Sequence, residues 1–217
     1  MQVNLTEALR YLGAEQADEA LMASMRAVAS ELEQTARPKW RYRVAEVEHT
    51  ETGELVAGLC LSGEMAKTML SDCDRAALLI CTLGAPFETL LRRKQARNMA
   101  EAAILDACGS AFVEVGCDAA EKEIAARFPD MYLTDRFSPG YGDLPLSIQP
   151  EFCAALDARR QLGITVTESL LMVPTKTVTA VIGISDKPQI ARIRGCDFCR
   201  RRENCTFRKG GRTCGAS

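Results

Sequence analysis

The residues with the clearest chemical potential lie at positions 136 to 142, which read Arg-Phe-Ser-Pro-Gly-Tyr-Gly. Pro139 fixes φ near the value needed at the second position of a β-turn, and Gly140 accepts the positive φ that a type II turn requires at the third. Tyr141 therefore stands between two glycines. Because Gly142 also lacks a Cβ, the main chain can approach a ligand closely and offer its N–H groups. The segment predicts a small-molecule site, the alternative being an ordinary surface turn.

Two side chains of this segment suggest what such a ligand would carry. Arg136 has a planar guanidinium that can bind a carboxylate through two parallel hydrogen bonds. The ring face of Tyr141 can attract a sulfonium or an ammonium group. A ligand with a carboxylate at one end and a cationic centre nearby would satisfy both residues, and S-adenosylmethionine is one such molecule. The alternative for Arg136 is a solvated surface side chain.

A second segment, residues 163 to 180, reads Gly-Ile-Thr-Val-Thr-Glu-Ser-Leu-Leu-Met-Val-Pro-Thr-Lys-Thr-Val-Thr-Ala. The pairing of Arg-x-x-Pro-Gly-Tyr with a downstream Thr-Glu-Ser-x-x-Met-x-Pro-x-x-x-Val resembles the activation (reactivation) domain of cobalamin-dependent methionine synthase. The likeness covers residues 136 to 141 and 163 to 179, and upstream it lies in the order of elements. In length the chain is similar to the short free-standing form of that domain.

This resemblance implies a role in repairing the synthase. When cob(I)alamin on the partner is oxidised, the resulting cob(II)alamin must gain an electron and take a methyl group from S-adenosylmethionine. The domain would hold the methyl donor over the cobalt, so that a rare encounter becomes effectively unimolecular. The implied partner is a cobalamin-dependent methionine synthase that lacks its own activation domain and carries the cobalamin. Flavodoxin or ferredoxin would be the electron donor.

The resemblance also assigns roles to individual residues. Arg136 would bind the carboxylate of the methyl donor, and Tyr141, on the turn set by Pro139, would line the pocket next to the corrin with the main chain of Gly140 and Gly142. Two further residues match letters of the family and are expected to shape the fold around the site rather than touch the ligand; they are Glu168 and Ser169. An alternative for Glu168 is a partner for a nearby arginine.

The sequence departs from the family pattern at several places. Family members follow Pro-Gly-Tyr with Pro-Ala-Cys-Pro and an acidic-His pair, whereas this chain continues Gly142-Asp143-Leu144-Pro145. An aromatic pair in the last strand is replaced by Val181 and Ile182, so one ligand-facing tyrosine is missing. We therefore expect a pocket that is complete only against the partner. The competing hypothesis is a metal-binding adaptor that docks on another corrinoid protein without binding the methyl donor.

Four cysteines near the end of the chain have the spacing Cys-x2-Cys-x5-Cys-x8-Cys, with few apolar residues between them. They are Cys196, Cys199, Cys205 and Cys214. Four thiolates on a segment without a core of its own predict a metal site, and both zinc and an iron-sulfur cluster accept four cysteine ligands. A cluster could supply the electron, whereas zinc could only be structural or help docking. The alternative is a reduced tail without metal.

The same tail is basic. From position 190 onward, eight basic residues face two acidic ones, a net charge of +6, and the preceding residues carry 19 basic and 27 acidic ones, a net charge of −8. Such segregation could steer the tail to an acidic partner or to nucleic acid. The favoured interpretation is that the arginines offset the thiolates, because the tail has only two aromatic residues and no recognisable nucleic-acid module.

Composition sets the class of protein. With 217 residues, 47% hydrophobic and 26% charged, the chain predicts one domain over residues 1 to 190 and a Cys-rich tail over 191 to 217. The other six cysteines lie in apolar surroundings and are expected to be buried and reduced, in a cytoplasmic protein without a membrane span or signal peptide. A single histidine, His49, excludes a Ser-His-Asp triad. Without the Asp-x-His-x-x-Gly cobalamin motif the chain is not the synthase itself, and no catalytic residue is predicted.

The elements that must position these residues predict an α+β fold, with a twisted, mainly antiparallel central sheet flanked by helices. A helix capped by Asp18 carries its apolar positions on one face, and a half-buried strand follows it, with Trp40 and Tyr42 among its inward positions. Residues 76 to 83 form a continuously apolar run, typical of a buried central strand. The helices expected next begin near Pro86, continue in a long segment through Phe112, and end with one from 150 to 162. A final strand spans residues 178 to 184.

Overall fold

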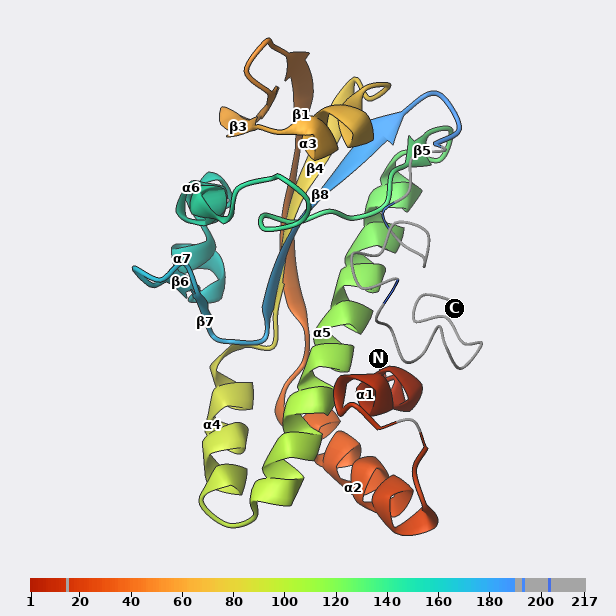
Figure 1. The fold of residues 1–217 in the computed structure, drawn as a ribbon, viewed down its shortest axis with the longest axis vertical. Helices are drawn as coiled ribbons and strands as arrows, with labels where there is room; N and C mark the ends of the chain where they lie inside the picture. The colour runs from red at the N-terminus through yellow and green to blue at the C-terminus, as the bar shows by residue number, and fades with distance from the viewer. Residues whose placement is uncertain (15, 190–192, 194–202, 204–217) are drawn as a thin grey trace.

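The computed structural model describes residues 1–14, 16–189, 193 and 203, and its centre is a six-stranded antiparallel sheet in the order β3-β2-β1-β4-β8-β5 (Figure 1). The strands of this sheet are β1 (Lys39–His49), β2 (Glu54–Val56), β3 (Leu59–Leu61), β4 (Arg75–Thr82), β5 (Tyr132–Leu133) and β8 (Thr177–Ser185). A separate hairpin consists of β6 (Thr165–Val166) and β7 (Met172–Val173). The predicted α+β class with a mainly antiparallel sheet is confirmed.

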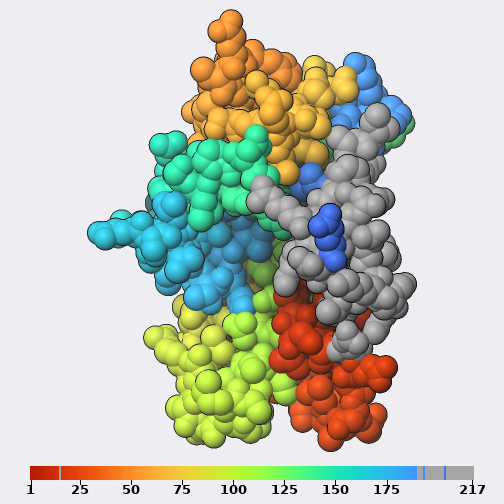
Figure 2. Space-filling view, viewed as in Figure 1, coloured from red at the N-terminus to blue at the C-terminus, as the bar shows by residue number. Residues whose placement is uncertain are grey.

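Helices cover both faces of the sheet. In chain order they are α1 (Leu5–Tyr11), α2 (Glu19–Thr35), α3 (Glu64–Leu70), α4 (Gly84–Gln95), α5 (Met99–Arg127), the 3-10 turn η1 (Leu146–Ile148), α6 (Gln149–Ala155) and α7 (Ala158–Leu162). The helices α1, α2, α4 and α5 share one hydrophobic cluster with the sheet, and α3, α6 and α7 share another. The molecule is elongated, with α2 and α4 at one end and β2, β3 and α3 at the other (Figures 1 and 2).

The central strand β4 explains why the two clusters exist. It pairs along its length with β1 on one side and β8 on the other. Successive side chains of a strand point to opposite faces, so Leu79 and Cys81 enter the cluster of α2 and α5 while Leu78 and Ile80 enter that of α3 and α6. The apolar run from residue 76 is therefore a strand covered on both faces, as predicted.

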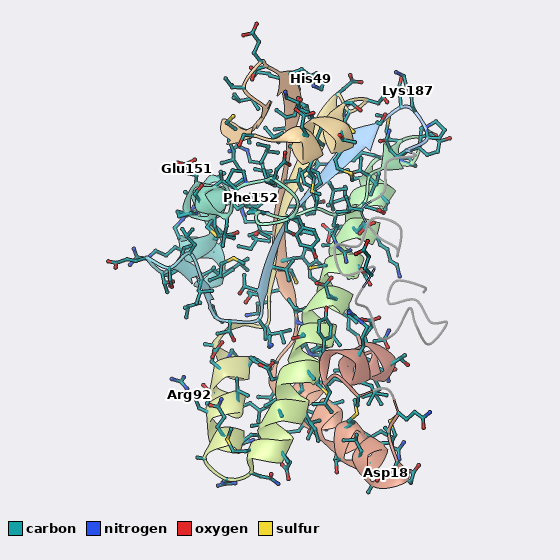
Figure 3. All side chains as sticks on the ribbon, viewed as in Figure 1. Asp18, His49, Arg92, Glu151, Phe152 and Lys187 are labelled. Atoms are coloured by element: carbon teal, nitrogen blue, oxygen red, sulfur yellow. The ribbon has the colours of Figure 1, made fainter. Side chains whose placement is uncertain are left out.

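The first predicted helix and strand are also confirmed. The carboxylate of Asp18 accepts a hydrogen bond from the Leu21 amide at 2.8 Å and caps α2, whose inward residues Met25 and Leu32 are fully buried. Side chains of β1 alternate between exposed and half-buried positions. Helix α6 is also amphipathic: Phe152 is fully buried, whereas the adjacent Glu151 is exposed (Figure 3).

The single helix expected from residue 150 to 162 is wrong, because two short helices, α6 and α7, occupy this stretch. Asp157 separates them with φ of 52°, in the left-handed region that Asp tolerates better than most residues. Its carboxylate accepts a hydrogen bond from Arg160 Nε at 2.6 Å, which holds the first turn of α7. Gly163 ends α7 with φ of 69°, the C-terminal position predicted for it.

The six cysteines outside the tail behave as small apolar residues. Five are buried and Cys60 is partly buried, and all six are free thiols. Burial raises the pKa of Cys73 and of Cys108 to about 11, so both thiols are protonated at neutral pH. Within the described part of the chain, the helices are all too short or too polar to cross a membrane.

Two glycines let the long helix α5 approach its neighbours closely. A Cβ on Gly109 would lie 2.4 Å from Phe87 Cε2 on α4. A Cβ on Gly116 would lie 2.4 Å from Pro38 Cβ and 2.7 Å from Cys81 Sγ on β4. Since α5 supports the site described below, these contacts fix its distance from the sheet.

We therefore expect Gly116→Ala to destabilise the protein by about 1–3 kcal/mol, because the added methyl overpacks the contact between helix and sheet. The same change at an unhindered helical position stabilises by roughly 0.5–1 kcal/mol, so the sign of the effect is informative. Urea unfolding monitored by circular dichroism measures it. Lys122→Ala, at an exposed position of α5, is the control and should change stability by less than about 0.5 kcal/mol. A stabilised Gly116→Ala protein would contradict the close approach.

Candidate functional site

The segment that carries the first motif, residues 134–144, is named the strap here because it lies along the edge of the sheet. It leaves β5 and is fixed to β8 by two hydrogen bonds between Phe137 and Val181, with N···O distances of 3.1 and 2.7 Å. Phe137 is fully buried in the cluster of α3 and α6. Neighbouring residues of an extended segment point to opposite sides, so Arg136 is directed away from Phe137 and towards α5.

The predicted type II turn is present in the strap. The Tyr141 amide donates to the Ser138 carbonyl at 2.9 Å, and Gly140 has φ of 90°. Pro139 is buried beneath the turn, whereas the Tyr141 side chain is 56% exposed. The turn therefore presents an aromatic ring to the outside on a rigid base.

The main chain around this turn already makes hydrogen bonds and packing contacts within the protein. The Gly140 amide donates to the Leu144 carbonyl at 2.9 Å, so it is satisfied within the strap. Gly142 has φ of 57°, and a Cβ there would lie 2.4 Å from Met65 Cε on α3. The side of Gly142 that was expected to allow a ligand to approach is thus packed against α3. What the turn offers outward is the ring of Tyr141 and the exposed Gly140.

Asp143, where the chain departs from the family pattern, joins the strap to α3. Its carboxylate accepts hydrogen bonds from the amides of Glu64 at 2.6 Å and Met65 at 3.0 Å, at the N-terminus of the helix. Gly63, the residue that precedes α3, has no side chain with which to cap it. A carboxylate at a helix N-terminus satisfies free amides and interacts favourably with the helix dipole. Asp143 therefore fixes the exit of the strap against α3.

The guanidinium of Arg136 lies against α5 and contacts three carboxylates. Its nitrogens are 3.1 Å from Glu114 Oε2, 2.7 Å from Asp118 Oδ1 and 2.5 Å from Glu121 Oε2. The three acidic residues follow the spacing i, i+4, i+7, which places them on one face of a helix. Only 7% of the Arg136 side chain is exposed. The arginine predicted to be available for a ligand is therefore already paired within the protein.

The cluster formed by Arg136 and these three acids has a net charge of −2, and the guanidinium at its centre stays protonated. Burial on its own lowers the pKa of the guanidinium, but the carboxylates of Glu121 and Asp118 raise it above its usual value. Asp118 is the most solvent-accessible of the three acidic partners, with 56% of its side chain exposed. A ligand carboxylate could reach Arg136 most readily by replacing Asp118. Sequence reasoning missed the three acids, although their spacing on one helix face was a signal.

Glu168 and Ser169 lie at the tip of the β6–β7 hairpin, where both are exposed. The Leu170 amide donates to the Thr167 carbonyl at 2.9 Å, and Leu170 has φ of 65°. The hydroxyl groups of Thr167 and Ser169 are 2.9 Å apart and share a hydrogen bond. The ion pairs of the described residues do not include Glu168, so the structure gives no support to its pairing with an arginine. The roles expected of Glu168 and Ser169 stay predictions.

Other residues of the second motif attach this hairpin to the sheet. Gln149 is 2% exposed and donates to Met172 Sδ at 3.0 Å and to Thr179 Oγ1 at 2.9 Å. The Thr177 hydroxyl donates to the Pro174 carbonyl at 2.7 Å. A buried amide with its partners in place fixes one arrangement of the surrounding elements. Met172 and Pro174 of the motif, together with Thr177 and Thr179 of β8, thus hold the hairpin beside α6 and β8.

The four tail cysteines predicted to bind a metal, and most of the tail itself, lie outside the described residues. Within the described residues, histidine, cysteine, aspartate and glutamate side chains do not gather in groups of three that could hold a metal ion. Two surface hollows of about 420 and 400 Å³ lie among α1, α2, α4 and α5. Residues 136–142 line neither of these hollows. In the described part of the chain, the strap presents Gly140 and Tyr141 as exposed residues.

Comparison with known proteins shows a likeness in three dimensions but none in sequence. No protein-family model and no curated protein sequence matches the chain. In three dimensions it is similar to the crystal structure of the MetH reactivation domain bound to AdoHcy, with a TM-score of 0.65 and 11% sequence identity, over 98% of this chain and 82% of that one. Identity this low speaks for the fold alone. The chain has the fold of the MetH reactivation domain.

Proposed function

We propose that this protein reactivates a cobalamin-dependent methionine synthase that lacks its own activation domain, by holding S-adenosylmethionine for reductive methylation of the partner's cob(II)alamin. The observation that carries the proposal is the strap, where a rigid type II turn presents the exposed Tyr141 five residues after the paired Arg136. Support comes from the shared fold, since the MetH reactivation domain is a domain whose crystal structure contains AdoHcy.

Each residue of the strap has a distinct task in this proposal. Arg136, held on α5, receives the carboxylate of the methyl donor in exchange for Asp118. The remaining negative charge of the cluster favours the cationic part of the ligand, because opposite charges within about 4–6 Å attract strongly where water is partly excluded. Tyr141 places its ring against the ligand. The turn at Pro139 and Gly140 fixes the position of that ring.

The exposed position of Tyr141 agrees with a site that closes on a partner. S-adenosylmethionine supplies the methyl group, and one electron must come from a separate donor such as flavodoxin, ferredoxin or a cluster in the tail. The chain itself contributes position: a ligand fixed on a rigid turn meets the partner's corrin in one orientation, which replaces a bimolecular encounter. Docking would also cover the tyrosine ring and exclude water from the reacting groups.

A second candidate function draws on a different observation. The guanidinium of Arg136 already has three carboxylate partners, and Gly142 and Asp143 are packed against α3. A chain in which these contacts never open would keep the fold without binding the methyl donor. It would then act as a metal-binding adaptor that docks on another corrinoid protein.

We also propose that Cys196, Cys199, Cys205 and Cys214 hold zinc or an iron-sulfur cluster. The support is their spacing and the basic residues between them, which would offset the charge of the thiolates. The six cysteines outside the tail are free thiols, and five of them are buried in the core, so they do not compete for the metal.

Titration calorimetry with S-adenosylmethionine tests the function. We expect the wild type to bind, more tightly when a cobalamin-loaded synthase without its activation domain is present, and Tyr141→Ala to weaken binding about tenfold through loss of the ring contact. Arg136→Lys should also weaken binding, because an ammonium cannot form two parallel hydrogen bonds with a carboxylate. Tyr132→Ala is the matched control, since this tyrosine is 48% exposed on β5, outside the strap, and should bind as the wild type.

The two candidate functions predict different calorimetry. Heats equal to buffer dilution for the wild type and both strap variants, with and without the cobalamin-loaded partner, would contradict methyl-donor binding and favour the adaptor. Binding by the wild type that is unaffected by Tyr141→Ala and Arg136→Lys would place the ligand elsewhere on the chain.

Metal analysis of protein purified without oxygen tests the tail. We expect stoichiometric zinc or iron, and loss of that metal in Cys196→Ser because three thiolates hold the ion less tightly than four. Cys60→Ser, at a partly buried cysteine of β3, is the control and should keep the metal. A visible absorption spectrum distinguishes the two metals, and a colourless zinc protein would exclude the tail as electron donor. Protein without metal before and after reconstitution would contradict the site.

A further inference from the structure

The acidic face of α5, defined as Glu114, Asp118 and Glu121, extends beyond its contact with Arg136. The side chains are 40%, 56% and 28% exposed, so each carboxylate keeps contact with solvent while it pairs with the arginine. One buried cation balances only one of three negative charges. Among the described residues, Arg136 and the acidic face together carry a net charge of −2.

The chain returns to this region after the last strand. The backbone amide of Ile193 donates to Asp135 Oδ2 at 3.1 Å, and the Ile193 side chain packs against the cluster of α3 and α6. Asp135 is the neighbour of Arg136 in the strap. The contact therefore anchors the beginning of the tail beside the arginine that touches the acidic face, even though β8 ends at Ser185.

The remaining 24 residues of the chain have the right charge and ample length for that face. Residues 194 to 217 contain seven basic and two acidic side chains, a net charge of +5 with neutral thiols. Four thiolates around a divalent ion contribute −2, so the sign stays positive with zinc bound. An extended chain spans roughly 3.3 Å per residue, so the arginine run at 200 to 202 can reach α5 from Ile193 without strain.

We propose that residues 194–217 dock on the acidic face of α5 as an intramolecular partner. The occupant is identified by where the chain is anchored, by its length and by its opposite charge. Several partly exposed ion pairs hold such a segment without fixing it permanently, because each exposed pair is weak on its own. This inference stands on charge and anchoring and does not depend on binding of the methyl donor.

Limited proteolysis of the full chain with chymotrypsin tests the docking, because Phe198 and Phe207 lie in the tail and none of the substitutions below removes a cleavage site. Cleavage after these residues is followed by mass spectrometry in 50 mM and 500 mM NaCl. A synthetic peptide of residues 194–217 corrects for the effect of salt on the protease. We expect cleavage of the wild type to be about tenfold slower in low salt than in high salt, since screening at high salt releases the segment.

Two sets of substitutions should abolish this difference. One neutralises the acidic face (Glu114→Gln, Asp118→Asn, Glu121→Gln), and the other neutralises the tail (Arg200→Gln, Arg201→Gln, Arg202→Gln) and leaves the described fold untouched. Both proteins should be cleaved at the fast rate in low salt. The control neutralises three exposed acids of β1 and its following loop (Glu46→Gln, Glu48→Gln, Glu51→Gln), which changes net charge equally and should leave the wild-type pattern.

The proposal is overturned by a wild-type cleavage rate that follows the free peptide at both salt concentrations. It is equally overturned by salt-independent protection, which would mean that the tail is protected by its own metal site. Equal behaviour of the tail variant and the control would also contradict docking on α5, whether or not the variant of the acidic face remains folded.

Discussion

The pairing of Phe137 with Val181 is the interaction on which the arrangement of the candidate site depends. Two backbone hydrogen bonds fix the strap to β8 in a single register. Because side chains alternate along an extended segment, that register sends Phe137 into the core and Arg136 to α5. A shift of one residue would exchange them, leaving a guanidinium in an apolar cluster and an aromatic ring among carboxylates. Burial of Phe137 therefore sets the position of the arginine. It also sets the position of the turn at residues 138 to 141, which carries Tyr141.

The environment of Arg136 combines two demands that oppose each other. A guanidinium that is 7% exposed needs carboxylate partners, since an unpaired buried charge is costly. The same partners compete with any ligand carboxylate. Of the three acids around this one cation, Asp118 is the most exposed, with 56% of its side chain accessible, and Glu121 the least, with 28%. The function proposed above therefore requires a ligand carboxylate to displace Asp118 while Glu114 and Glu121 keep the guanidinium paired.

Features decided by local backbone chemistry could be predicted from the sequence, and features decided by long-range partners could not. The type II turn at Pro139 and Gly140 and the cap at Asp18 follow from φ preferences and from hydrogen bonds between residues close in sequence. The capping of α3 by Asp143 joins residues 78 and 79 positions apart, and nothing in either segment alone identifies the other. The motif predicts that Arg136 binds a ligand, but the motif does not include its three carboxylate partners, which lie 15 to 22 residues earlier on α5. The break at Asp157 was missed because a non-glycine residue in the left-handed region has only a weak sequence signal.

The exposure of the Tyr141 side chain follows from the way in which the elements around the strap pack together. The sheet carries a helical layer over each face, and the strap fills the edge between α3 and α5, so the turn at its end has packed neighbours below and none required above. An aromatic ring kept half exposed on a buried proline gains little stability for the isolated chain, since much of its apolar surface stays in water. The basic tail begins beside the same strap, at the contact between Ile193 and Asp135. The strap thus holds an arginine paired with α5 and an exposed tyrosine, and through Asp135 it also contacts the beginning of the cysteine-rich segment, more than 50 residues further along the chain.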